Sequence, residues 1–126
     1  RNSDWKSLVR AVVESVAYQS YDLFNSMKKD GLKPKIVKVD GGMVSNNWFS
    51  QFLSDIINLN VVRPRVLETT ALGVALFAGY QVGEFKSLNE IKHIWKKDRV
   101  FSPKINKSLR NNLLQGWKVA IRKTLA

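Results

Sequence analysis

The sequence contains no cysteine and a single histidine, His93, which narrows the kinds of site it can build. Without cysteine there is neither a disulfide nor a thiolate metal site. One histidine argues against a histidine-based zinc site or a catalytic triad. The sequence also lacks the GxxxxGK pattern of a P-loop and the GxGxxG pattern of a dinucleotide-binding fold. A nucleotide site in this chain would therefore need a different phosphate-binding or base-binding motif.

Long apolar runs are also missing. No stretch approaches the roughly 20 apolar residues that cross a bilayer, and no signal peptide is visible, so we expect a cytoplasmic protein with no membrane partner. The 126 residues suffice for one domain with a core of its own. A hydrophobic content of 44% and a charged content of 25% are ordinary for a soluble globular protein.

Acidic residues are scarce: 10 against 21 lysines and arginines, for a net charge of +11. Residues 85–126 hold 11 of the basic side chains and only two acids, a net of +9. Such a segment attracts nucleic acid or an anionic surface, although a lysine-rich solvated face has the same composition. Trp48, Trp95 and Trp117 fit core stripes better than an exposed stacking platform, which favours the solvated face. A stand-alone nucleic-acid-binding or regulatory module is the alternative function.

A strand, a glycine doublet and a helix follow one another in the middle of the chain. The β-branched run from Ile36 to Val39 predicts a buried strand, and Gly41 and Gly42 come directly after Asp40. A helix is then expected from about Ser45 to Asn58, with one face formed by Trp48, Phe49, Phe52, Leu53, Ile56 and Ile57. Glycine backbone beside a helix N-terminus can receive a phosphate or a flat ring. The doublet is equally compatible with a simple turn, and the asparagines after it with helix caps.

The remaining periodicity predicts an α/β domain in which helices cover a mostly parallel sheet. Asn60 is expected to turn the chain between the central helix and the next strand. The further elements expected are a helix from Ser3 to Lys29, a strand at Val61-Val62 ended by Pro64, a helix that follows Glu68 to Thr70 and runs through Val82, a short helix from Ser87 to Trp95, a strand at Val100-Phe101 and an amphipathic helix from Asn106 to Leu125. Ala71, Ala75 and Gly79 share a helix face along which we expect a neighbouring backbone to approach.

The run from Val39 to Pro64, VDGGMVSNNWFSQFLSDIINLNVVRP, resembles the carboxy-terminal domain of the FGGY carbohydrate kinases, which belong to the actin-like ATPase superfamily. The resemblance continues from Glu68 to Gly83 and backwards from Tyr18 to Val13. The Asn46-Asn47 pair is similar to that of the glycerol kinases within the family. The resemblance implies a ribonuclease-H-like fold, with residues 1–126 forming the carboxy-terminal part of the second kinase lobe.

Glycerol kinases transfer the terminal phosphoryl group of ATP to glycerol, giving ADP and sn-glycerol 3-phosphate. The resemblance implies that Gly42 lies against the adenine nucleotide and that Asn46 hydrogen-bonds near the base. Gly41 is expected to serve the turn, with a weaker claim to contact the nucleotide. The implied cofactors are ATP and Mg²⁺. The implied partners are the adenine nucleotide, glycerol and the remainder of the kinase, and a homo-oligomer is compatible with the sequence.

The family's catalytic aspartate, polyol site, phosphate-gripping loops and magnesium ligands have no counterpart in these 126 residues. We therefore assign no catalytic and no metal-binding residue, since Asp40, Asp55 and Glu68 match structural positions. The sequence starts with Arg1 and enters the family pattern in mid-domain. We expect it to be part of a kinase and to be inactive alone.

Overall fold

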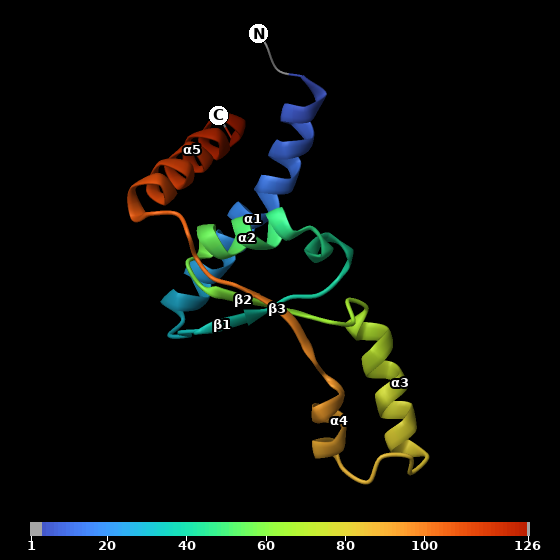
Figure 1. Ribbon diagram of the computed structural model, residues 1–126. Helices are drawn as coiled ribbons and strands as arrows, with labels where there is room; N and C mark the ends of the chain where they lie inside the picture. The colour runs from blue at the N-terminus through green and yellow to red at the C-terminus, as the bar shows by residue number, and fades with distance from the viewer. Residues whose placement is uncertain (1–3, 126) are drawn as a thin grey trace.

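The computed structural model describes residues 4–125, in which five helices and a short 3₁₀ helix accompany a three-stranded sheet (Figure 1). The elements are α1 (Trp5–Lys29), β1 (Ile36–Lys38), the 3₁₀ helix η1 (Gly42–Ser45), α2 (Asn47–Ile57), β2 (Asn60–Pro64), α3 (Thr69–Gln81), α4 (Leu88–Ile94), β3 (Lys97–Phe101) and α5 (Lys107–Leu125). The α/β class is confirmed. The expected helix start at Ser3 lies outside the described residues. Within them, α1 begins at Trp5, directly after its N-cap Asp4.

The sheet is mixed, with strand order β1-β2-β3. β1 and β2 are parallel, with Val37 opposite Val61, as the strand–helix–strand pattern predicts. β3 returns antiparallel to β2 and places Phe101 opposite Val61. β2 ends at Pro64, as predicted, and the register shifts between Arg63 and Pro64. An irregularity is where a strand tolerates a residue that has no N–H to donate.

The turn between α2 and β2 lies at Asn58 and not, as predicted, at Asn60. Asn58 adopts the left-handed conformation, with φ 57° and ψ 44°, and ends the helix. Asparagine tolerates this conformation better than other residues with side chains. Asn60 already pairs with Ile36 as the first residue of β2. Both asparagines carry the same turn signal, and the pairing with β1 decides between them.

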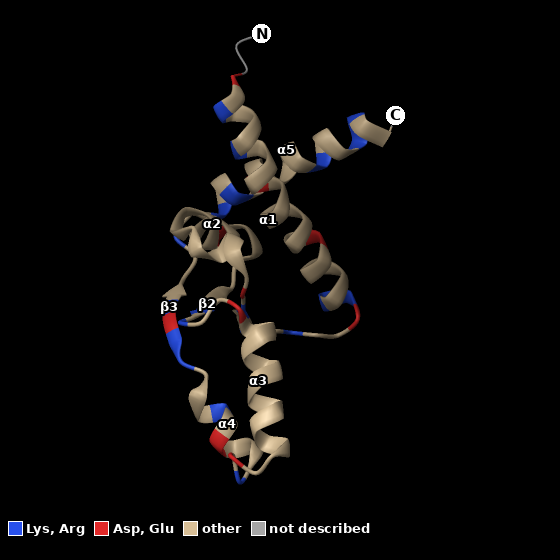
Figure 2. Cartoon of the chain, turned by 90° about the vertical axis from the view of Figure 1, so that its right-hand side faces the viewer, with Lys and Arg blue, Asp and Glu red and all other residues tan. Residues whose placement is uncertain are grey.

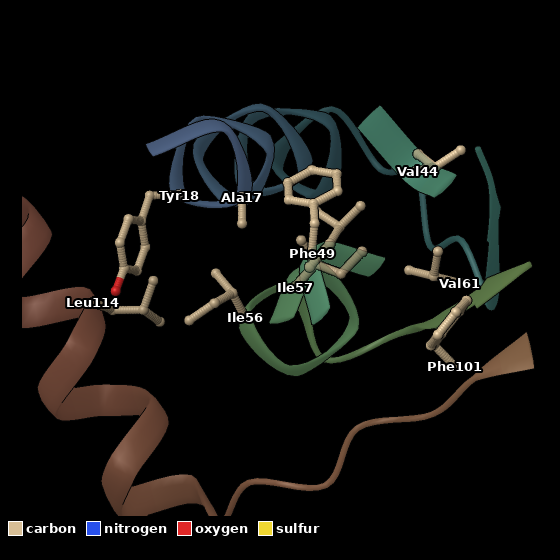
Figure 3. Packing of buried hydrophobic residues seen from close by; sticks show 10 residues of the cluster. Ala17, Tyr18, Val44, Phe49, Ile56, Ile57, Val61, Phe101 and Leu114 are labelled. Carbon is tan, nitrogen blue, oxygen red and sulfur yellow. The ribbon is translucent and has the colours of Figure 1, made fainter. Parts of the chain in front are cut away.

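The core lies between the sheet and the helices α1 and α2 (Figure 3). Ile56, Ile57 and Val61 are among its fully buried side chains. α5 closes one side, where its Leu114 is buried and the Trp117 ring stacks on Tyr18 with centroids 5.4 Å apart. Packing of apolar helix faces onto the sheet supplies most of the stability of such a layered domain.

The prediction that Trp48 belongs to the buried face of α2 is wrong. Trp48 is 44% exposed and stacks on Phe52, with ring centroids 5.1 Å apart and planes 9° from parallel. It occupies the first turn of α2, and the buried face begins with Phe49 and Ser50. Helical spacing alone therefore placed Trp48 on the core side, although the sheet does not cover that part of the helix.

Helices α3 and α4, with the loop between them, form an arm that stands apart from the sheet and from α1 and α2 (Figures 1 and 2). Neither helix contains a buried residue. We call residues 69–94 the α3–α4 arm. Exposed apolar side chains on it include Val74, Phe77, Val82 and Leu88. The small-residue face of α3 receives an aromatic side chain and not the expected backbone, because a Cβ at Gly79 would lie 2.8 Å from the Phe85 ring.

Across residues 4–125, no helix combines the length and the apolar character needed to cross a bilayer.

Candidate functional site

The glycine turn, residues 40–47, lies where the parallel strands β1 and β2 end. The carboxyl ends of parallel strands meet at one edge of a sheet, and ligands of α/β proteins bind there. The turn is tied to the chain that follows β2, because the Gly41 amide donates to the Leu67 carbonyl at 2.8 Å. The Thr69 hydroxyl donates to the Asp40 carboxylate. The entrance to the turn is thus fixed by the start of α3.

Gly41 has a backbone conformation that only glycine adopts readily. Its φ is 86° and its ψ is 171°, a combination in which any Cβ is strained. This conformation is the physical reason for glycine at position 41 and supports its expected role in the turn.

At Gly42, the first residue of η1, the backbone conformation does not require glycine. Its φ is not positive, unlike that of Gly41. A Cβ built on Gly42 meets nothing within 4 Å in the described part of the chain. Neither conformation nor packing thus requires glycine here. The bare backbone leaves a surface that a ligand can approach closely.

Asn46 is the N-cap of α2. Its Oδ1 accepts from the amides of Trp48 at 2.9 Å and Phe49 at 3.3 Å. The Asn46 side chain can therefore cap the helix and contact a ligand at the same time, because the two roles use different atoms. The oxygen satisfies the helix terminus, and the exposed Nδ2 donates no hydrogen bond within residues 4–125. Nδ2 is the atom of Asn46 that can donate to a ligand.

Arg63, which the sequence reasoning missed, supports the turn from β2. Its Nη1 donates to the carbonyl oxygens of Val44 at 2.9 Å and Ser45 at 3.1 Å, and to Oδ1 of Asn47 at 2.9 Å. Its Nε and Nη2 donate to Oδ2 of Asp98 in β3, at 2.8 and 2.6 Å. The sequence shows an arginine in a strand and an acid 35 residues later. Only the pairing of β2 with β3 brings the two together.

The acids that were candidates for chemistry occupy structural positions. Asp55 is 6% exposed and accepts from the Lys104 amide at 2.6 Å and from Nε2 of Gln51 at 3.1 Å. Glu68 is the residue before α3 and makes no side-chain cap bond. Within residues 4–125, no three acidic or histidine side chains converge on one point.

Two hollows reach the glycine turn at its ends. One, of about 340 Å³, lies between the starts of α1 and α2 and is lined by Trp5, Lys6, Val9, Arg10, Val13, Asn46 and Trp48. The other, of about 220 Å³, is lined by Lys38, Val39, Asp40, Thr69 and Trp95. In the first hollow Arg10 pairs with Glu14, Nε to Oε1 2.6 Å, as the i,i+4 spacing predicts. This hydrogen bond raises the pKa of Arg10 above its ordinary value.

The family model for the FGGY family of carbohydrate kinases, C-terminal domain, matches residues 1–82, more than half of the chain. The chain belongs to the FGGY family of carbohydrate kinases. The glycine turn and the start of the α3–α4 arm both fall inside the matched region, whereas β3 and α5 lie beyond it. The resemblance seen in the sequence is confirmed.

Glycerol kinases are among the similar curated members of the FGGY family. The glycerol kinase of Gluconobacter oxydans (strain 621H) is 50% identical over 119 residues, which cover 94% of this chain and 23% of that protein. The glycerol kinase of Coxiella burnetii (strain Dugway 5J108-111) is 46% identical over 125 residues, 99% of this chain and 25% of that protein. The chain spans about a quarter of the length of these relatives.

A solved FGGY kinase has the same fold. The crystal structure of Plasmodium falciparum glycerol kinase with ADP matches 99% of this chain and 25% of that chain, with a TM-score of 0.82 and 34% identity. Together with the family match, this likeness confirms the actin-like ATPase fold expected from the sequence.

Proposed function

We propose that residues 1–126 are the carboxy-terminal, nucleotide-binding part of a glycerol kinase that converts ATP and glycerol to ADP and sn-glycerol 3-phosphate. The observation that carries this proposal is the open surface over Gly42, where nothing within the described residues demands glycine. The relatives that are 46–50% identical over nearly the whole chain are glycerol kinases, which supports the choice of substrate.

Each residue of the turn has a distinct part in this proposal. Gly42 offers bare backbone against which the adenine nucleotide lies. Asn46 donates from Nδ2 near the base while its Oδ1 keeps the helix cap. Gly41 shapes the backbone that leads to both, through its positive φ. Phosphoryl transfer depends mainly on positioning and charge stabilisation, so a rigid wall for the nucleotide contributes directly to the reaction.

The remaining parts of the reaction belong to the rest of the kinase in this proposal. We assign the Mg²⁺ ligands, as the resemblance implies, to groups outside the chain. The catalytic aspartate and the glycerol site are assigned there as well. The partners are accordingly ATP or ADP, glycerol and the rest of the kinase, in the cytoplasm, and the proposal is compatible with a homo-oligomer.

The test is a titration of the ¹⁵N-labelled chain with ADP, followed by amide chemical shifts. We expect saturable shifts at Gly41, Gly42 and Asn46 and in the first turn of α2. Pyrophosphate serves as the control for charge alone, because it binds lysine-rich surfaces without offering a base. A matched Gly42→Val variant should fold normally, since a Cβ at this position meets no atom within 4 Å, and should lose the ADP response.

Shifts confined to the basic helix α5 and reproduced by pyrophosphate would contradict the proposal. They would show anion binding by the carboxy-terminal lysines and arginines instead of a nucleotide site.

A further inference from the structure

We propose that Arg63 is a positioning residue of the nucleotide site and that Asp98 holds it in place. This inference rests on the proposed function of the glycine turn. In this proposal Arg63 does not contact the nucleotide and acts through the main chain of the turn.

The contacts of Arg63 join three segments that are far apart in sequence. From β2 its guanidinium reaches the turn at Val44, Ser45 and Asn47, and it reaches β3 at Asp98. The Arg63 side chain is only 12% exposed, whereas its partner Asp98 is 43% exposed. The bond to the Val44 carbonyl is part-buried, and the other Arg63 bonds lie at the surface. The guanidinium also lies 5.4 Å from the centroid of the Phe101 ring, which limits its movement on another side.

The two carbonyls bound by Arg63 are at the end of η1. Carbonyls at a helix end have no partner within the helix and carry partial negative charge, so a cation there is favourable. η1 spans only Gly42–Ser45, so it begins at the bare glycine and ends directly before the α2 cap residue Asn46. The shape of this single turn therefore sets the distance between the two groups proposed to contact the nucleotide.

Lysine cannot reproduce this arrangement. Arginine presents five N–H donors in a rigid plane, whereas lysine carries its three donors on one nitrogen. At Arg63 one nitrogen serves the turn while Nε and Nη2 serve Asp98. A lysine could reach the turn or Asp98, but it would lack the second set of bonds. The role thus depends on shape as well as on charge.

The experiment uses the complete kinase, made by joining this chain to the preceding part of the Gluconobacter oxydans glycerol kinase. Arg63→Lys and Asp98→Asn are compared with Arg99→Lys, the control. Arg99 pairs with Arg63 across the strands and lies 5.1 Å from the same Phe101 ring, but its side chain donates no hydrogen bond within residues 4–125. The measurements are the KM for ATP, the Kd for ADP, the KM for glycerol and the Tm.

We expect Arg63→Lys to weaken ATP and ADP binding by about two- to thirteenfold, the range for one lost hydrogen bond. The KM for glycerol should stay within twofold, roughly the scatter of near-neutral changes. Asp98→Asn should weaken nucleotide binding less than Arg63→Lys does. Asp98 is 43% exposed, and the asparagine still offers one oxygen as an acceptor. Arg99→Lys should change neither nucleotide constant. A merely structural role would lower the Tm without this split between nucleotide and glycerol.

Unchanged nucleotide constants in Arg63→Lys, or an equal change for glycerol, would overturn the inference. Should that variant not fold, Asn47→Ala decides, since it removes one acceptor of Arg63 at an exposed position. It should weaken ADP binding with an unchanged KM for glycerol, and unaltered ADP binding would reject the positioning role. Gly42→Val separates this inference from the proposed function. If Gly42→Val weakens nucleotide binding and Arg63→Lys does not, the positioning role alone is refuted. If Gly42→Val does not weaken nucleotide binding, the site itself is refuted.

Discussion

At the scale of single residues, the two adjacent glycines differ in backbone conformation, although a Cβ at either one would meet no atom within 4 Å. Gly41 has the conformation that excludes side chains, and Gly42 has the open surface that tolerates them. The stability of the fold and the access of a ligand are therefore separated between neighbouring positions. Alanine substitutions can test the two properties independently.

Gly41→Ala should lower the free energy of unfolding by about 1–3 kcal/mol, the cost of holding a side chain in a glycine-only region. Gly42→Ala is the matched control and should change it by no more than about 0.5 kcal/mol. Urea denaturation of the chain, monitored by circular dichroism, measures both. Equal destabilisation by the two substitutions would show that Gly42 is also required by the turn.

Asn46 calls for variants that separate its two ends. Asn46→Ala removes the cap together with the donor and should cost about 0.5–2 kcal/mol in stability. Asn46→Ser keeps an oxygen for the amides of Trp48 and Phe49 but loses the Nδ2 donor. It should leave stability nearly unchanged and still raise the KM for ATP of the complete kinase, by about two- to thirteenfold. An unaltered KM in Asn46→Ser would mean that Asn46 only caps α2.

At the scale of elements, the sequence predicts those whose signals are local. The Asn46 cap of α2, the parallel pairing of β1 with β2 and the short helix after Ser87 follow from spacing and from residues adjacent in the chain. The exposure of Trp48, the choice of Asn58 for the turn and the position of Arg63 do not. Each depends on which part of the folded chain packs against the residue, and the local sequence pattern carries no information about that packing.

The polar residues of α2 also make contacts that sequence patterns cannot predict, because the partners are far apart in the chain. The Ser54 hydroxyl donates to the Phe101 carbonyl at 2.9 Å, and Gln51 donates to the Ser102 carbonyl at 2.8 Å. Asp55 accepts from the Lys104 amide. One helix face thus fixes the segment that leads from β3 to α5. A buried serine and a buried aspartate in an amphipathic helix indicate such partners without naming them.

Asp55→Ala should lower the free energy of unfolding by about 1–3 kcal/mol, because the Lys104 amide would lose its partner at a part-buried site. Near-ultraviolet circular dichroism should report a change in the packing of Trp117, since α5 follows that segment. Urea denaturation gives the energy. Asp98→Ala serves as the control for loss of a more exposed acid and should cost less. A neutral Asp55→Ala would show that the link to α5 does not contribute to stability.

At the scale of the whole molecule, the proposed function makes the chain one wall of a nucleotide site whose other groups belong to the rest of the kinase. We expect no glycerol phosphorylation by these residues alone, because the catalytic aspartate and the glycerol site are assigned to the rest of the kinase. A coupled assay of ADP release with glycerol and Mg-ATP at high protein concentration measures this. Joining the chain to the preceding part of the Gluconobacter oxydans enzyme should restore turnover. Turnover by the isolated chain that persists through purification would contradict the assignment.

The α3–α4 arm has a consequence for how the molecule fluctuates. Amide hydrogens exchange with solvent through openings whose free energies range from near zero up to that of global unfolding. An arm without a buried residue in either helix can open while α2 stays closed on the core. Amides of the arm should therefore exchange early and those of Leu53 to Ile57 last. ADP bound at the glycine turn should slow amide exchange at the start of α2 and leave exchange in the arm unchanged. The exchange rates of the arm therefore serve as an internal reference for protection by the nucleotide.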